Sequence, residues 1–244
     1  MNDQIKQAVD ISQKAQRNYD LSKVIPQTDL DTLIYAATNA PSKQNEAHYE
    51  LKVFTDQNMI ENIYNHTKHY ALVKRDDTEM KGMFEERDGK FWQNEDRSIC
   101  NSQILANVLF VYCDYDGEAR AGTHRLAQKN KNSESWELYT EQKNYSIGIS
   151  VGELILSATL LGYKTGICSA FSKKEMQGVI GSDKLPKLLV GIGFENVDLD
   201  RRYHAKIKNK DVPPEFRNGD IEHPWRFGIR EKETIKVSIN GTDS

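Results

Sequence analysis

The chain is poor in cysteine and has no long uninterrupted apolar run, and each shortage removes a class of protein. Three cysteines, an odd number without a C-x-x-C pair, argue against a disulfide framework and favour a reducing cytosol. The longest apolar helical pattern is interrupted by Ser150, Glu153 and Ser157, so we predict no membrane span. The first residues, MNDQIKQ, lack the apolar stretch of a signal peptide. We therefore expect a cytoplasmic protein.

A strong excess of charge is also lacking. Lysine and arginine number 33 against 36 acidic residues, which gives a formal net charge of −3. Nucleic-acid binding requires a concentrated basic surface, so nucleic acid is not an expected partner. The mean hydropathy is low, at −0.70, but apolar residues recur with helix and strand periods. A chain of 244 residues with such patterns is long enough to bury a sizeable core.

The stretch Asn39–Tyr49, NAPSKQNEAHY, concentrates short polar groups between a helical pattern at Leu30–Thr38 and a strand pattern at Glu50–Thr55. Pro41 is predicted to end the helix because it has no N–H and its ring clashes with the preceding turn. The polar side chains that follow are Ser42, Gln44 and Asn45. They could bind a planar polar ligand or simply the local backbone, and for these residues alone an ordinary helix stop and loop is the commoner explanation.

The second informative stretch follows a long apolar helix predicted at Asn144–Gly162. One face of this helix carries Ile147, Val151, Leu154, Ile155 and Ala158. Gly162 is expected to end it as a C′ residue. Next come Tyr163–Phe171, YKTGICSAF, a helix from Ser172 and a strand at Leu188–Phe194.

An A-P-S-x-x-N turn before a strand, with a late helix reading L-G-x-x-x-G-x-C and then a G-x-G strand, resembles the FMN-dependent nitroreductase family. The resemblance spans roughly Lys14 to Phe194. It implies an α+β fold, with a mixed, mostly antiparallel sheet between helices, in an intertwined homodimer. We expect a single domain over residues 1–244, with insertions around 74–96 and 116–143 and a C-terminal extension.

The same resemblance implies residues for the FMN phosphate. Arg17 takes the last basic position of the family's R-x-S-x-(R/K) run and Lys14 an earlier one, although a solvated basic helix end is the commoner meaning of such residues. Near the other end of the chain, Arg230 fits the arginine of a K-x-R pair. Gly228 takes the place of the lysine, so Arg226 or Arg202 would have to serve.

For the flavin ring, the resemblance implies three segments. The turn would contribute Pro41, Ser42, Gln44 and Asn45. The pyrimidine edge would meet Arg97, Asn101 and Gln103, where many members have a lysine; without that cation the charge on reduced flavin lacks a partner. Cys168, Ser169 and Ala170 would pass against the ring, with the backbone of Ser169 and Ala170 near N5. Cys168 is expected to be a packed, inert thiol.

Several further expectations concern the surroundings of the site. His66 and His69 lack a third ligand, so no metal site is expected. The aromatic residues Phe84, Phe91 and Trp92 suggest a lid or a satellite core, and Trp136 and Tyr139 are candidate substrate contacts. Gly148 and Gly152 would permit a close backbone approach. In the family the helix that corresponds to Asn144–Gly162 forms much of the dimer interface. The family's C-terminal tail, here Glu233–Ser244, crosses to the partner subunit.

The function that the resemblance implies is that of an FMN-dependent enzyme. It would oxidise NAD(P)H and reduce a nitroaromatic, quinone or similar acceptor by two electrons. The lack of a Ser-His-Asp set or a carboxylate pair fits chemistry carried by a cofactor. The alternatives are another flavin reaction on the same fold, such as reductive dehalogenation or flavin cleavage, and a flavin-binding protein without NAD(P)H turnover.

Overall fold

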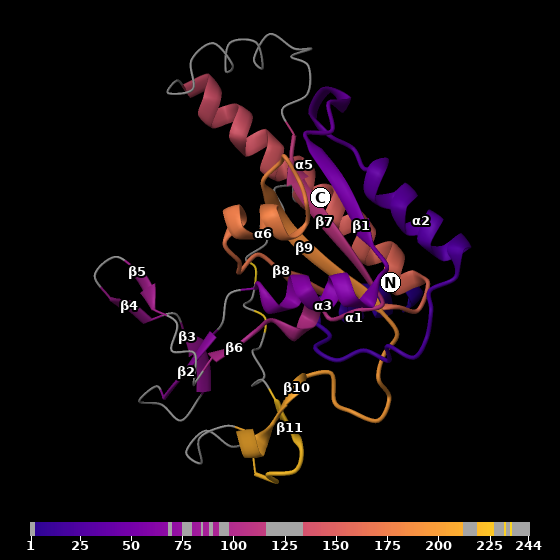
Figure 1. Cartoon of the computed structure of the whole chain (residues 1–244). Coiled ribbons are helices and arrows are strands. Elements are labelled where there is room, and N and C mark those ends of the chain that lie inside the picture. Colours follow the sequence, from indigo (N-terminus) through magenta and orange to yellow (C-terminus); the bar gives the residue numbers. More distant parts are fainter. Residues whose placement is uncertain are drawn as a thin grey trace, which may run out of the picture.

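The computed structural model describes residues 3–67, 70–74, 80–83, 85–87, 90–92, 98–115, 134–211, 219–226, 232 and 235 (Figure 1). At its centre lies a four-stranded sheet in the order β1-β7-β9-β8, in which every neighbouring pair is antiparallel. Its strands are β1 (Tyr49–Phe54), β7 (Val108–Asp114), β8 (Lys164–Cys168) and β9 (Pro186–Gly193). The predicted α+β fold with a mostly antiparallel sheet between helices is confirmed, and no parallel pair occurs among the described strands.

Helices cover both faces of the sheet. On one face lie α2 (Gln27–Thr38) and α5 (Glu134–Leu160), and α1 (Asp3–Ser12) packs on α5. On the other face lie α3 (Gln57–Asn65) and α6 (Lys173–Val179). None of the described helices combines the length and the apolar character needed to cross a membrane.

Strand β7 explains the layering, because its successive side chains enter opposite cores. Val108, Phe110 and Tyr112 pack with α2 and α5. Leu109, Val111 and Cys113 pack with α3 and α6. The predicted apolar face of α5, from Ile147 to Ala158, is buried in the first core as expected.

Smaller elements surround this frame. The strands of the smaller sheets are β2 (Tyr70–Lys74), β3 (Met80–Met83), β4 (Glu85–Arg87), β5 (Lys90–Trp92), β6 (Ser98–Ile99), β10 (Tyr203–Lys208) and β11 (Pro224–Arg226). They pair as β3-β2-β6, β4-β5 and β10-β11. The single-turn helices are η1 (Lys43–Asn45), η3 (Ser102–Ile104) and η4 (Asn209–Asp211). The side chains of Phe84, Phe91 and Trp92 lie outside the described residues, and so does the tail Glu233–Ser244 apart from Ile235.

Two helix boundaries differ from the sequence prediction. At the start of the chain, the apolar stripe that includes Ile5, Ala8 and Val9 predicts a helix over Asp3–Asn18. Helix α1 instead ends at Ser12, because the next residues bond other segments. The Gln16 N–H donates to the Thr165 carbonyl at 2.8 Å and the Arg17 N–H to the Arg201 carbonyl at 2.9 Å. Helix α5 begins at Glu134, well before the predicted Asn144.

Two glycines lie within α5, and a third follows it. Gly162 has φ +91°, which confirms its predicted role as the C′ residue after the helix. A Cβ added at Gly148 or Gly152 would meet no described atom within 4 Å. The close backbone approach predicted at these two glycines is therefore not made within the described part of the chain.

Candidate functional site

Gln103 joins three segments that are far apart in the sequence. Its Nε2 donates to the Ile167 carbonyl on β8 at 2.5 Å, and its Oε1 accepts a hydrogen bond from Nη1 of Arg17. Its own carbonyl accepts a hydrogen bond of 3.0 Å from the Tyr19 hydroxyl. Because both ends of the amide are used, the orientation of the side chain is fixed and the Arg17 guanidinium is held beside β8.

Two glycines let η3 approach the sheet this closely. A Cβ added at Gly166 of β8 would lie 2.5 Å from the Gln103 carbonyl oxygen, and one at Gly191 of β9 would lie equally close. Real Cβ atoms do not approach a backbone atom to this distance. The space beside Gly166 of the L-G-x-x-x-G-x-C motif and Gly191 of the G-x-G motif is thus occupied by Gln103.

The positive charge of Arg17 acts on two buried groups nearby. Burial raises the pKa of the Cys168 thiol to about 11, and the Arg17 charge opposes this only in part. Burial lowers the pKa of His204 to about 4, the Cys100 carbonyl opposes that shift, and Arg17 adds to it. Both groups are therefore neutral at pH 7, which agrees with the prediction of an inert Cys168 thiol.

The chain emerges from the core immediately after Cys168. Cys168 is buried, Ser169 is exposed and Ala170 is half-buried. The Phe171 N–H donates to the Ser169 carbonyl at 3.2 Å, so the segment bends, and Phe171 bridges to Thr67. Asn101 is also buried near this bend, and its backbone N–H donates to the Thr67 hydroxyl at 3.1 Å.

The turn before β1 is held in a less common backbone conformation. Asn45 has φ 60° and Ala47 φ 36°, which is the left-handed region. Residues other than glycine rarely adopt it, and such strain clusters at functional sites. The Ser42 hydroxyl accepts a hydrogen bond of 3.0 Å from the Ala47 N–H and thereby closes the turn. Pro41 is exposed, and Gln44 lies within η1.

A buried group of charged and aromatic side chains supports this turn. Glu46 Oε2 lies 3.2 Å from His48 Nε2, and their side chains are only 8% and 3% exposed. The His48 ring meets the Tyr139 ring edge-on at 5.2 Å. Lys143 lies over the same tyrosine ring and forms an ion pair of 2.5 Å with Asp114.

Sequence reasoning singled out Tyr139 but missed Glu46 and His48. The available signal was two ionisable residues two places apart just before a strand.

The turn and the Arg17 segment lie at opposite ends of the sheet. Tyr49 pairs with Asp114, the last residue of β7, whereas Tyr19 bridges to Glu195, just beyond the end of β9 that pairs with Val108. Six residue steps along β7 amount to roughly 20 Å. Figure 1 shows the turn above the start of β1, away from the N-terminus. The structure thus unites Arg17, Gln103 and residues 167–170, and it holds residues 41–45 elsewhere.

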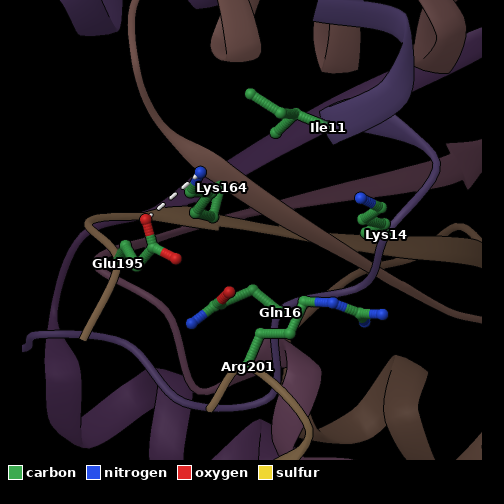
Figure 2. A pocket seen from close by; sticks show the side chains of 6 residues that line it. All are labelled: Ile11, Lys14, Gln16, Lys164, Glu195 and Arg201. Atoms are coloured by element: carbon green, nitrogen blue, oxygen red, sulfur yellow. Dashed lines mark ion pairs between the residues drawn. The ribbon is translucent and has the colours of Figure 1, made fainter. Parts of the chain in front are cut away.

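The predicted phosphate residues are also separated. Lys14 lines a cavity of about 210 Å³ (Figure 2) together with Ile11, Gln16, Lys164, Glu195 and Arg201. Arg17 instead bonds Gln103. Arg202 binds both carboxylate oxygens of Asp200 at 2.9 Å, and this pairing lowers the pKa of Asp200 to about 2. Arg230 lies outside the described residues.

Metal ligands do not gather anywhere in the described residues. No group of three or more His, Cys, Asp or Glu side chains there could hold a metal ion. Nδ1 of His66 lies 2.8 Å from the Asn62 carbonyl, and His69 is not among the described residues.

Comparisons with known proteins agree with the fold. The family model described as Nitroreductase matches residues 12–194. The hypothetical oxidoreductase YcnD of Bacillus subtilis has a similar fold, with a TM-score of 0.55 and 19% identity over 85% of this chain and 70% of that one. A candidate NAD(P)H:FMN oxidoreductase of Staphylococcus epidermidis has a TM-score of 0.54 and 18% identity, over 82% of this chain and 90% of that one. Nitroreductase A of Vibrio parahaemolyticus has a TM-score of 0.53 and 14% identity, over 80% of this chain and 68% of that one. No curated protein matches the chain.

Proposed function

Because the chain belongs to the nitroreductase family, we propose that it oxidises NAD(P)H and reduces a nitroaromatic, quinone or similar small acceptor by two electrons, with FMN as its cofactor. Family membership supports flavin-dependent oxidoreduction in general. The observation that carries the finer proposal is the chain of hydrogen bonds from Arg17 through Gln103 to Ile167, next to the exposed bend at Ser169 and Ala170.

The residues at this bend fit a flavin. A flavin ring has a polar pyrimidine edge and flat apolar faces, and bound FMN would supply the redox chemistry. We assign Arg17 and Gln103 to the pyrimidine edge and the backbone of Ser169 and Ala170 to the neighbourhood of N5. Asn101 and Cys168 support this side of the ring from the core.

The resemblance assigned Arg17 to the FMN phosphate, but in this proposal Arg17 takes another role. The family's lysine is missing before β7, and Arg17 places a fixed positive charge in the same neighbourhood from the other end of the chain. A cation held there stabilises the negative charge of reduced flavin because it needs no reorganisation. Arg230 remains a proposal for the flavin phosphate, whereas Lys14, which the resemblance also assigned to that phosphate, lines a separate cavity.

The proposed site needs a second copy of the chain. The turn with Pro41, Ser42, Gln44 and Asn45 lies at the far end of the sheet from Arg17 within one copy. Helix α5 also exposes an apolar stripe, with Tyr145 60%, Ile149 44%, Leu156 36% and Leu160 53% exposed. We propose a homodimer in which this stripe is covered and the turn of one copy reaches the flavin of the other.

The remaining proposals concern the chain as a whole. We propose one domain over residues 1–244 and a cytoplasmic location. The three cysteines are free and buried in the structure, which suits a reducing compartment.

Absorbance of the purified protein tests the proposal most directly. We expect a flavin spectrum, release of FMN rather than FAD on heating, and ping-pong oxidation of NAD(P)H, because one flavin face serves donor and acceptor in turn. A colourless protein that takes up no added FMN would overturn the enzyme assignment. A yellow protein without NAD(P)H oxidation would favour the flavin-binding alternative.

Variants of Arg17 test its separate role. Arg17→Met should lower the midpoint potential of bound flavin and weaken FMN binding, whereas Arg17→Lys keeps the charge and should retain most of both. If the potential of Arg17→Met equals that of the unmodified protein, Arg17 does not face the pyrimidine edge.

A further inference from the structure

The cavity beside the end of α1 gathers positive charge from three distant segments. Lys14 follows α1, Lys164 begins β8, and Arg201 follows β9. Figure 2 shows the charged ends of Lys14 and Arg201 directed toward one side of the cavity, while Lys164 and Glu195 form an ion pair of 3.2 Å on the other. Among the described residues of the lining, Glu195 is the one acidic side chain, so their formal charge is +2.

Two of these cations have no anionic partner among the residues that the structure describes. Lys14 forms no side-chain hydrogen bond or ion pair with any residue that the structure describes. Arg201 donates one hydrogen bond of 3.2 Å, to the neutral Ala15 carbonyl, and no described carboxylate pairs with it. Since like charges repel when brought together, an anion with several oxygens would be stabilised between them.

The size of the cavity limits what can enter. At about 210 Å³ it is smaller than the roughly 300–1,000 Å³ of sites that enclose a whole small-molecule ligand. It is also several times the roughly 30 Å³ of one water molecule. A single anionic group of phosphate size fits, whereas a flavin or nicotinamide ring with its sugar does not.

The cavity faces away from the proposed flavin site. The N–H groups of Gln16 and Arg17 donate to opposite neighbours, Thr165 and Arg201, so this segment is extended. Side chains alternate along an extended segment. Gln16 accordingly lines the cavity, whereas Arg17 turns to Gln103.

We propose that this cavity is a second anion site, which binds a phosphate group that is not the phosphate of the flavin. A phosphate monoester carries about −1.5 to −2 charge at pH 7, which matches the +2 wall. The guanidinium of Arg201 and the ammonium of Lys14 both donate to its oxygens. The source is either free phosphate or the phosphate of a nucleotide such as NADPH.

Calorimetric titration of the full-length protein with inorganic phosphate, at constant ionic strength, tests the site without any need for flavin or activity. We expect saturable binding that Lys14→Met and Arg201→Met each weaken about tenfold or more, because each removes a charged donor. Glu195→Gln should strengthen binding, since it removes the acidic group. Lys187→Met is the matched control: that lysine pairs with Asp114 at the other end of β9, and its loss should leave binding unchanged.

Further titrations identify which molecule supplies the phosphate group. Tighter binding of 2′-AMP than of phosphate or 5′-AMP, lost in Arg201→Met, assigns the site to a nucleotide 2′-phosphate; equal binding assigns it to free phosphate. FMN affinity should not change at saturating phosphate, and competition would overturn the proposal by giving the cavity to the flavin. No saturable binding, or equal binding by all variants, would also overturn it. If Arg201→Met does not fold, Lys14→Met tests the cavity by itself, because Lys14 is exposed and its replacement should not disturb the fold.

Discussion

The hydroxyl of Ser150 in α5 donates a hydrogen bond of 2.6 Å to the carbonyl oxygen of Ala37 in α2. Ala37 lies in the last turn of its helix, where carbonyls lack an intrahelical donor, and the residue four places on is Pro41, which has no N–H. The Tyr49 hydroxyl donates to the same carbonyl at 2.5 Å. The proline that ends α2 thus leaves an acceptor through which α5 and β1 fix the start of the turn.

Removal of the Ser150 hydroxyl should destabilise the fold. Ser150 is fully buried, and its oxygen also lies 2.9 Å from the Tyr112 hydroxyl, which would lose its partner. We expect Ser150→Ala to lower the free energy of unfolding by about 1–3 kcal/mol in urea titrations. Ser157→Ala on the same helix should change it by less than about 0.5 kcal/mol. Equal effects of the two variants would show that the Ala37 carbonyl does not need this donor.

Gly166→Ala should separate η3 from the sheet. The added Cβ would lie 2.5 Å from the Gln103 carbonyl oxygen, and overpacking of this kind costs about 1–3 kcal/mol. Gly178→Ala in α6 is the control, because its Cβ meets nothing within 4 Å and alanine favours a helix by up to about 1 kcal/mol. Thermal unfolding should therefore move to lower temperature for Gly166→Ala and to equal or higher temperature for Gly178→Ala.

His204 should make the stability depend on pH. Its pKa is about 4 in the folded state because of burial, against 6.5 when unfolded. The unfolded chain then binds the proton first, so stability is complete above pH 6.5 and falls toward pH 4, by up to about 3 kcal/mol. Below pH 4 this contribution should fall no further.

Unfolding titrations at pH 7, 5.5 and 4 measure the effect. His204→Gln should flatten the pH dependence in that window, whereas His66→Gln, at the exposed end of α3, should not. An unchanged slope in His204→Gln would place the titrating group elsewhere.

Cys168 should be unreactive in the folded protein. Burial holds its pKa at about 11, so little thiolate exists at pH 8. Mass spectrometry after iodoacetamide treatment should show Cys168 unmodified in the native protein and modified in denaturant. Cys168→Ala should retain most NAD(P)H oxidation, and loss of that activity with FMN still bound would give the thiol a chemical role.

The sequence by itself determined the elements whose signals are local. The apolar run of β7, the period of α5, the left-handed Gly162 and the N-cap Ser172, whose hydroxyl accepts from the Glu175 N–H at 3.4 Å, all depend on residues a few places apart. The motif order also identified the family over almost the same residues that the family model matches.

Only the tertiary structure decided which polar groups meet. Arg17 and Gln103 are 86 residues apart, and Ser150 and Ala37 are 113 apart. In a local pattern, Arg17 looks like the solvated end of a basic helix, and Glu46 and His48 look like ordinary turn residues. Their partners are set by the antiparallel register and by the packing of η3 and α5 against the sheet. Those contacts bring together side chains that share no sequence period.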